Sequence, residues 1–326
     1  MNITFFNRQQ GERFSIEKVT SSIIKEVSKT NIVSSFVVPE LRASIKSVLK
    51  NIIYVRSHRS KDGINHVTGD IHYCILGLIG CKSVLTIHDT VFLTVQQNPI
   101  SYFIKWLLWL YLPCKFADKI VCISEKTKEE LANHHISTTK VSVIYDPVDL
   151  TKVTVEKSLH KRARILHIGT KPNKNLIRVI KSLEGIECEL IIIGHLNDEL
   201  IDQLKHSGIS YKNMVGISEV ELASAYMAAD IVSFPSLYEG FGMPIIEGQL
   251  SNCAVLTSNI SPMTEVGKDS VLYVDPYDIN SIRDGFQLLI DDKQFRQQLI
   301  EKGKINAKRF SPENISNYYL ELYKNI

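Results

Sequence analysis

The chain has 326 residues, of which 44% are hydrophobic and 22% are charged. These proportions are typical of a globular protein and exclude disordered, fibrous and collagen-like classes, and the length suffices for two domains that each bury a core. The six cysteines form neither a CxxC pair nor a cluster with histidine, so they favour neither a zinc site nor a disulfide framework.

The net charge of +3 is unevenly distributed along the chain. Residues 1–160 contain 20 Lys and Arg against 14 Asp and Glu, whereas the remainder contains 18 against 21. A basic first half fits an anionic partner, such as phosphate or a membrane surface, and equally fits ordinary solvated lysines. The first residues lack a signal-peptide pattern, and the longest apolar stretch, 103–112, is far shorter than the ~20 residues that span a bilayer. We therefore expect a cytoplasmic protein.

In the first half of the chain, short β-branched runs alternate with longer amphipathic runs. Ser15 is expected to cap a helix over 16–29, and Glu125 to begin a helix that ends near His134. The runs expected to form strands are 3–6, 35–39, 51–55, 64–68, 83–89, 119–124 and 140–149.

A charged segment, 157–164, precedes a second series of the same kind. A helix is expected over 175–183, another after its cap Asp278, and a last one where Ser311 is followed by proline at the first helical position. The runs expected to form strands are 164–169, 188–194, 230–235, 253–258 and 270–276.

Strands that alternate with helices predict an α/β fold with parallel sheets covered on both faces, and two such series predict two domains. We expect an N-terminal Rossmann-like domain at 1–158, a C-terminal one at 159–310, and a final helix at 311–326 that packs back on the first domain. Ligands of such sheets bind beyond the carboxyl ends of the strands, so the residues that follow each strand are the candidates for a site.

The most informative segment is DIVSFPSLYEGFGMPIIEG, at 230–248. Gly240 and Gly242 allow the backbone to approach a ligand closely, and the helix that the following proline opens offers unpaired N–H groups to a phosphate. Glu239 and Glu247 flank this turn, and because carboxylates repel phosphate they are expected to face hydroxyl groups. A diphosphate flanked by polyols describes a nucleotide-sugar.

The part YEGFGMPIIEG resembles the E-x7-E motif of family 4 glycosyltransferases, which have the GT-B fold. Further blocks resemble the same family in its order, namely HVTGDIHY, LTIHDT, CISEKTKEEL, VIYDPVD, ILHIGTKPNKNL and AADIVSFPS. The resemblance implies two Rossmann-like domains whose parallel sheets face each other across a cleft, with the donor held by the C-terminal domain and the acceptor by the N-terminal one. It also implies transfer of a hexosyl-type unit from a nucleotide-diphosphate sugar, with retention of configuration and without a metal or other cofactor, in bacterial surface-polysaccharide synthesis.

By the same resemblance, the motif residues receive individual roles. Glu247 binds the ribose hydroxyls of the donor, and Glu239 lies near the transferred sugar as a catalytic residue. Backbone N–H groups around the sugar and the diphosphate come from the residues between the two acids, which are Gly240, Phe241, Gly242 and Met243.

The block HIGTKPNKNL supplies the expected positive charge. Gly169 follows a strand, and Lys174 resembles the family's lysine that binds the diphosphate and stabilises the leaving group. The family often has arginine directly after the glycine, but Thr170 occupies that position here. Lys171 is therefore the candidate for the second charge.

Candidates in the first half are less specific. His88 resembles the family's histidine that faces the donor sugar, although a structural cap beside Asp89 is an alternative. Gly69 and Asp70 in HVTGD, Gly11 in the first loop, and Asp89 are candidates for acceptor or cleft residues. The first three also fit a simple turn. In the family's usual account the donor phosphate itself accepts the acceptor's proton, and no DxD metal motif occurs in the chain.

The segment ISYFIKWLLWLYLPCK, at 100–115, contains both tryptophans, Trp106 and Trp109, and is predicted to be helical. Its apolar surface beside Lys105 and Lys115 fits a helix that rests in a membrane interface, and it also fits a core helix or a dimer contact. If the segment lies on the inner face of the cytoplasmic membrane, we expect a lipid-linked saccharide as the acceptor. Otherwise a saccharide acceptor is expected.

Other functions on the same architecture are a nucleotide-sugar epimerase, a phosphorylase or an inactive GT-B scaffold. A phosphorylase needs an additional anion pocket or a pyridoxal phosphate lysine, for which the sequence has no candidate. The presence of Glu239, Glu247, Lys174 and His88 argues against a loss of activity. A nucleic-acid partner is disfavoured because no basic stripe is interleaved with aromatic residues.

Overall fold

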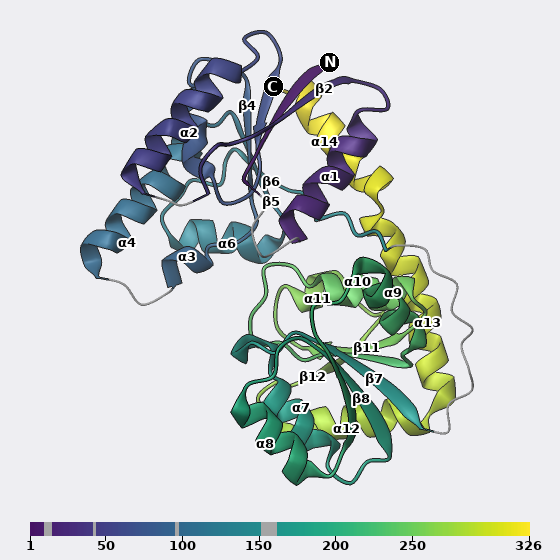
Figure 1. Ribbon diagram of the computed structural model, residues 1–326. Helices are drawn as coiled ribbons and strands as arrows, with labels where there is room; N and C mark the ends of the chain where they lie inside the picture. Colours follow the sequence, from purple (N-terminus) through teal and green to yellow (C-terminus); the bar gives the residue numbers. More distant parts are fainter. Residues whose placement is uncertain (10–14, 42–43, 95–97, 151–161) are drawn as a thin grey trace. The chain divides into compact units, whose positions relative to one another are not determined.

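The computed structural model describes residues 1–9, 15–41, 44–94, 98–150 and 162–326. Within these ranges the chain divides into two compact units, Met1–Pro147 with Ser311–Ile326, and Val148–Phe310. Each unit is built around a six-stranded parallel sheet with helices on both faces, as Figure 1 shows for each unit by itself. The predicted α/β class with two Rossmann-like units is confirmed.

The first unit has the strand order β2-β1-β3-β4-β5-β6. Its strands are β1 (Asn2–Asn7), β2 (Ile32–Val37), β3 (Ile64–Val67), β4 (Ser83–Ile87), β5 (Lys119–Cys122) and β6 (Val141–Val143). Its helical elements are α1 (Ser15–Val27), α2 (Ile45–His58), η1 (His72–Leu78), α3 (Val91–Thr94), α4 (Pro99–Lys105), η2 (Trp106–Tyr111), α5 (Leu112–Phe116), α6 (Glu125–Asn133) and α14 (Pro312–Lys324). Because all neighbouring strands pair in parallel, their carboxyl ends share one edge of the sheet.

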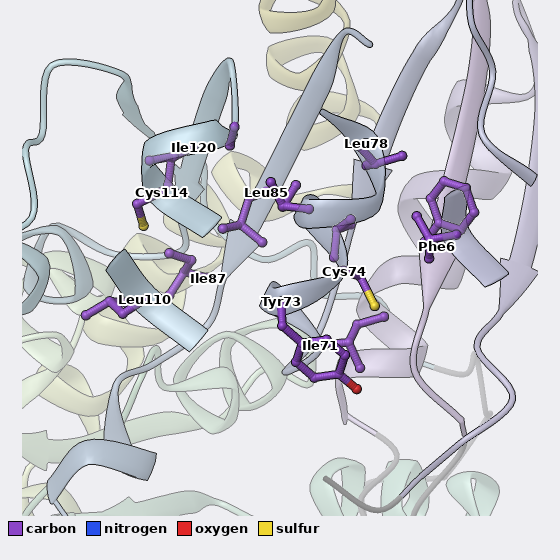
Figure 2. Packing of buried hydrophobic residues seen from close by; sticks show 14 of the residues in the cluster. Phe6, Ile71, Tyr73, Cys74, Leu78, Leu85, Ile87, Leu110, Cys114 and Ile120 are labelled. Atoms are coloured by element: carbon purple, nitrogen blue, oxygen red, sulfur yellow. The ribbon is translucent and has the colours of Figure 1, made fainter. Parts of the chain in front are cut away.

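The core of this unit forms where helical segments cover the central strands. All five residues of β4 are buried, as expected for a parallel strand covered on both faces. Figure 2 shows Leu85 and Ile87 of this strand among side chains from η1 and from the segment near residue 112, including Leu78, Leu110 and Cys114. The carboxyl ends of the central strands are therefore supported by a well-packed apolar core.

The terminal helix α14 belongs to the first unit, where it packs beside α1. Its anchor is the fully buried His66 of β3, whose Nδ1 lies 2.7 Å from the Tyr323 hydroxyl and whose Nε2 lies 2.8 Å from Thr86 Oγ1. The ring of Tyr319 lies against the same imidazole. These contacts use both nitrogens of a histidine that burial would otherwise leave unsatisfied.

The second unit has the strand order β12-β11-β10-β7-β8-β9. Its strands are β7 (Ala163–Ile168), β8 (Cys188–Ile193), β9 (Ser210–Met214), β10 (Ile231–Phe234), β11 (Ala254–Ser258) and β12 (Leu272–Val274). Its helical elements are η3 (Pro172–Lys174), α7 (Leu176–Leu183), α8 (Asp198–Ser207), α9 (Glu219–Ala228), α10 (Met243–Leu250), α11 (Met263–Gly267), α12 (Ile279–Asp291), α13 (Lys293–Ala307) and η4 (Lys308–Phe310). The neighbours β7 and β10 lie at the centre, so their carboxyl ends are adjacent.

The prediction of a strand at 51–55 is wrong, because these residues belong to helix α2. The run is rich in β-branched residues, which favoured a strand, but the buried positions Val48, Asn51 and Val55 recur at helical spacing. Ser44 also caps the helix, since its side chain accepts a hydrogen bond from the Ser47 N–H.

Other differences are smaller. Strand β9 was not predicted, because it is an edge strand with largely exposed, polar residues. Helix α13, which Asp292 caps, was not predicted as a helix separate from α12. Ser15 is the first residue of α1 rather than its cap, and α10 begins at Met243, one residue before Pro244.

The segment 100–115 is not one regular helix, because a π-helical stretch, η2, separates α4 from α5. Pro113 has no N–H to donate to the carbonyl of Trp109 four residues earlier. That carbonyl instead accepts from His72 Nδ1 at 2.8 Å, and the Leu112 N–H bonds to the carbonyl of Leu107. The proline thus explains the local widening of the helix.

Candidate functional site

In the second unit, the carboxyl end of β7 brings a lysine over a glycine. Gly169 has φ +89°, a conformation that side-chain-bearing residues rarely adopt. A Cβ at this position would lie 2.9 Å from Lys174 Cγ, so the glycine gives room to the lysine stem. Thr170, in the position where arginine is common in the family, donates its hydroxyl to the His195 carbonyl at 2.5 Å, while Lys171 is exposed.

Lys174 and Glu239 form an ion pair, with 2.6 Å between Nζ and Oε1. Their side chains are 21% and 14% exposed, so both groups are largely withdrawn from water. The ammonium group also lies 5.0 Å from the ring centroid of Phe234, which adds a cation–π contact. The two residues predicted to act on the diphosphate and on the sugar are therefore brought together.

Two asparagines hold the loop of Glu239 beside η3. The carbonyl of Asn173 accepts from the Leu237 N–H at 2.8 Å, and its side chain donates to the Tyr238 carbonyl. Asn175, buried and left-handed at φ 65°, donates to the carbonyls of Pro235 and Pro276. Sequence reasoning missed this role, although an asparagine between a lysine loop and a helix is a recognisable signal for a left-handed residue.

The glycine loop leads into α10 as the sequence suggested. Gly242 has φ +115° and stands directly before the helix, whose second residue is Pro244. Phe241 is buried against the ring of Phe310, whereas Gly240 and Met243 are half-buried. The first turn of a helix has N–H groups without intrahelical partners, so this end of α10 suits an anion.

Glu247 lies one turn into α10 and is only 7% exposed. Its Oε2 accepts a hydrogen bond of 2.5 Å from the hydroxyl of Tyr226, which α9 contributes and which is fully buried. Burial, followed by the nearby carboxylate, raises the pKa of Tyr226 well above its ordinary value, so the phenol remains a donor. Tyr226 is a second residue that the motif did not reveal.

In the first unit, His88 follows β4 and contacts Asp146, with 3.5 Å between Nδ1 and Oδ2. Burial would lower the pKa of His88, but the charge of Asp146, together with Asp89, raises it above the ordinary value. Asp89 also accepts from the Val91 N–H at 3.0 Å and so begins α3. The cap function thus belongs to Asp89, and His88 is held by a different acid.

Gly69 and Asp70 lie beside Arg8, at the carboxyl ends of β1 and β3. Gly69 has φ +77°, and a Cβ there would meet Arg8 Cδ at 3.4 Å. Arg8 pairs with Glu17 at 2.8 Å and with Asp70 at 3.2 Å. Gly11, the remaining predicted cleft residue, lies outside the described residues.

A cavity of about 310 Å³ adjoins this arginine. Its lining combines the Arg8–Glu17 pair, hydroxyl and amide side chains, and the apolar side chains of Ile16, Ile24 and Val37. Such a lining suits a ligand rich in hydroxyl groups. Within the described ranges, no three His, Cys, Asp or Glu side chains gather as the ligands of a metal ion would.

The tryptophans of segment 100–115 pack against the core of the first unit. The indole of Trp106 donates to the His134 carbonyl at 3.0 Å, and that of Trp109 to the Asp70 carbonyl at 2.9 Å. The exposed apolar residues lie instead on α4, where Ile100 is 73% and Phe103 55% exposed. None of the helices in the described part of the chain has the length and apolar character needed to cross a bilayer.

Comparison with protein families gives two matches that follow each other along the chain. Residues 23–152 match the model of Glycosyltransferase Family 4, and residues 155–306 match that of Glycosyl transferases group 1. O-antigen chain mannosyltransferase B of Escherichia coli is 28% identical over 272 residues, which are 74% of this chain and 70% of the relative.

A second relative comes from Campylobacter jejuni. This N-acetylgalactosamine-N,N'-diacetylbacillosaminyl-diphospho-undecaprenol 4-alpha-N-acetylgalactosaminyltransferase is 29% identical over 256 residues, which are 73% of this chain and 69% of the relative. The chain therefore spans about two thirds of the length of these relatives.

Two solved structures share the fold over the whole chain. Anabaena HepE in complex with UDP and glucose has a TM-score of 0.79 at 15% identity and covers 100% of both chains. The apo form of the lipopolysaccharide outer core galactosyltransferase WaaB has a TM-score of 0.73 at 16% identity, with 100% of this chain and 99% of that chain covered. The fold shared with these glycosyltransferases is GT-B.

Proposed function

Because the chain belongs to glycosyltransferase family 4, we propose that it transfers a hexosyl unit from a nucleoside-diphosphate sugar to a saccharide or lipid-linked saccharide in the synthesis of a cell-surface polysaccharide. The observation that carries this proposal is the cluster at the carboxyl ends of β7 and β10. There Lys174, Glu239 and the start of α10 combine a cation, an acid and the positive end of a helix dipole, with the buried Glu247 one turn away. The relatives named as O-antigen and undecaprenol-linked glycosyltransferases support the class of acceptor.

In the proposed reaction, configuration is retained and no metal takes part. The start of α10 and Lys174 stabilise the charge of the departing diphosphate, and Glu247 holds the ribose. The bond from the anomeric carbon to the phosphate oxygen breaks while a bond to the acceptor oxygen forms on the same face. The acceptor's proton passes to the phosphate oxygen, so no protein nucleophile is needed. The cavity beside Arg8 is the proposed binding site of the acceptor.

A thermal-shift screen of nucleoside diphosphates and their sugars tests the donor site. A ligand at one hundred times its dissociation constant stabilises the native state by about 2.7 kcal/mol. We expect Glu247→Ala to weaken nucleotide binding, because the buried acid holds the ribose, and Glu239→Ala mainly to slow turnover. Glu301→Ala, which removes an exposed acid on α13, is the matched control. Equal and negligible effects of the first two changes would count against the donor site.

We also propose that the protein rests peripherally on the inner face of the cytoplasmic membrane through the exposed turn of α4. The apolar side chains of Ile100 and Phe103 protrude there, and Lys105 follows them in a unit with a surplus of basic residues. Phe103→Ser is expected to reduce flotation with anionic liposomes while leaving the melting temperature unchanged. Equal flotation of Phe103→Ser and the unaltered protein would refute this contact. The tryptophans are unsuitable for the test, because they support the core.

A further inference from the structure

A buried histidine–aspartate pair lies at the carboxyl edge of the first sheet. His88 follows β4 and Asp146 follows β6, and β5 lies between these strands, so the sheet order brings the two loops together. The residues are 9% and 5% exposed, and Nδ1 lies 3.5 Å from Oδ2. The contact is therefore an internal one, in which solvent screening is weak.

Each member of the pair has one further buried polar atom. Among the residues that the structure describes, His88 Nε2 and Asp146 Oδ1 have no hydrogen-bond partner. Buried polar atoms are nearly always paired in native proteins, since an unpaired one is unfavourable. The uncompensated Nε2 indicates that the imidazole is built to meet a polar group from a ligand.

We propose that Asp146 is a positioning residue, which keeps the proton of the neutral His88 ring on Nδ1 and so leaves Nε2 as an acceptor for a sugar hydroxyl. The inference rests on the proposed function, because that function supplies the sugar substrate. The carboxylate lies 3.5 Å from Nδ1 and favours a proton on that nitrogen, which selects one tautomer of the neutral ring. The sequence motifs assign no role to Asp146.

The charges around the ring determine how this arrangement depends on pH. The titratable groups that face His88 come from several elements and are Arg8, His66, His72, Asp89 and Asp146, with Tyr319 beside Asp146. The two carboxylates outweigh burial and Arg8, so they raise the pKa of His88. When pH falls through that pKa, Nε2 becomes a donor and the acceptor for the hydroxyl is lost. Activity should therefore fall on the acid side.

The substitution Asp146→Asn removes the charge and keeps the shape. Without the carboxylate, burial prevails, and the pKa of His88 should fall. The matched control is Asp118→Asn. Asp118 accepts from the Ser83 N–H and hydroxyl at the opposite end of β4, so this change also removes a partly buried, hydrogen-bonded carboxylate.

The first measurement follows the His88 ring by NMR in protein labelled with 15N-histidine, without substrate. The signal is assigned by its absence in His88→Gln. We expect a titration at lower pH in Asp146→Asn and an unchanged one in Asp118→Asn. A His88 titration at the same pH in Asp146→Asn and in the unaltered protein overturns the proposal, whatever the enzyme proves to transfer.

The second measurement is the pH profile of kcat with the nucleotide-sugar selected by the thermal-shift screen. The acid limb should move to lower pH in Asp146→Asn together with the titration. If the titration moves and the limb stays, His88 does not accept from the substrate and the inference is overturned, whereas the donor site of the second unit, which Glu247→Ala tests, is not affected. Asp146→Ala, which offers Nδ1 no acceptor, should lower kcat more than Asp146→Asn with little change in KM.

Discussion

Replacing Tyr226 by phenylalanine removes one buried hydrogen bond and almost nothing else. The hydroxyl donates to Glu247 Oε2 over 2.5 Å, and the tyrosine ring is fully buried in the second unit. Phenylalanine fills the same ring volume, so the lost free energy is that of a hydrogen bond to a charged group, about 1.5–3 kcal/mol. In a domain of this size, each kcal/mol corresponds to about 2–4 °C, so the melting temperature should fall by about 3–12 °C.

The same change should weaken binding of the nucleotide. Tyr226 fixes one oxygen of Glu247, and without it the carboxylate must be ordered when the ribose arrives. We therefore expect a smaller thermal shift with a nucleoside diphosphate, measured by differential scanning fluorimetry at equal ligand concentration. Tyr211→Phe, which changes an exposed tyrosine on β9 of the same unit, is the control. If both variants melt together and bind alike, the hydrogen bond does not support the site.

Two further predictions concern backbone geometry and pH. Gly169→Ala should reduce nucleotide affinity, because the added Cβ displaces the side chain of Lys174. Gly185 also has a positive φ but open space around it among the described residues, so Gly185→Ala should lower stability alone. Ligand titration of the two variants distinguishes these effects. Burial lowers the pKa of both His66 and His167 to about 3, so the stability they contribute is complete above the unfolded-state pKa of about 6.5 and is lost as pH falls toward 3. Each histidine should contribute a slope of about 1.4 kcal/mol per pH unit in urea unfolding between pH 5.5 and 4.5, and a flat profile would contradict this.

The parts of the fold that could be predicted are those in which local sequence and tertiary environment agree. Strands β4 and β8 are continuous apolar runs because parallel strands are buried on both faces, and their positions follow directly. The strand predicted at 51–55 is wrong because the β-branched residues favour a strand, whereas the buried positions have helical spacing. The segment packs as a helix. The π-helical stretch before Pro113 depends on His72, which is distant in sequence.

The candidate site divides in the same way. Residues at the ends of strands can be located from the sequence, because the topology of a parallel sheet dictates where ligands bind. Their supporting partners are chosen by three-dimensional proximity. Tyr226 meets Glu247, and Asp146 meets His88, across separations that no motif spans. The role of Asn175 depends on a left-handed backbone, from which its side-chain amide donates to carbonyls that follow two different strands.

The ion pair between Lys174 and Glu239 has a consequence for selectivity that neither residue implies alone. The sequence assigned the lysine to a diphosphate and the acid to a sugar, yet in the structure each satisfies the other at 2.6 Å in a largely buried position. A ligand that engages only one of them removes the ion-pair partner of the other, which is unfavourable for a partly desolvated charge. A nucleoside-diphosphate sugar supplies both an anion for Lys174 and hydroxyl groups for Glu239. If the protein has the proposed function, the ion pair therefore favours binding of the intact donor over a nucleotide or a free sugar. Only the intact donor gives both Lys174 and Glu239 a new partner when their mutual contact is broken.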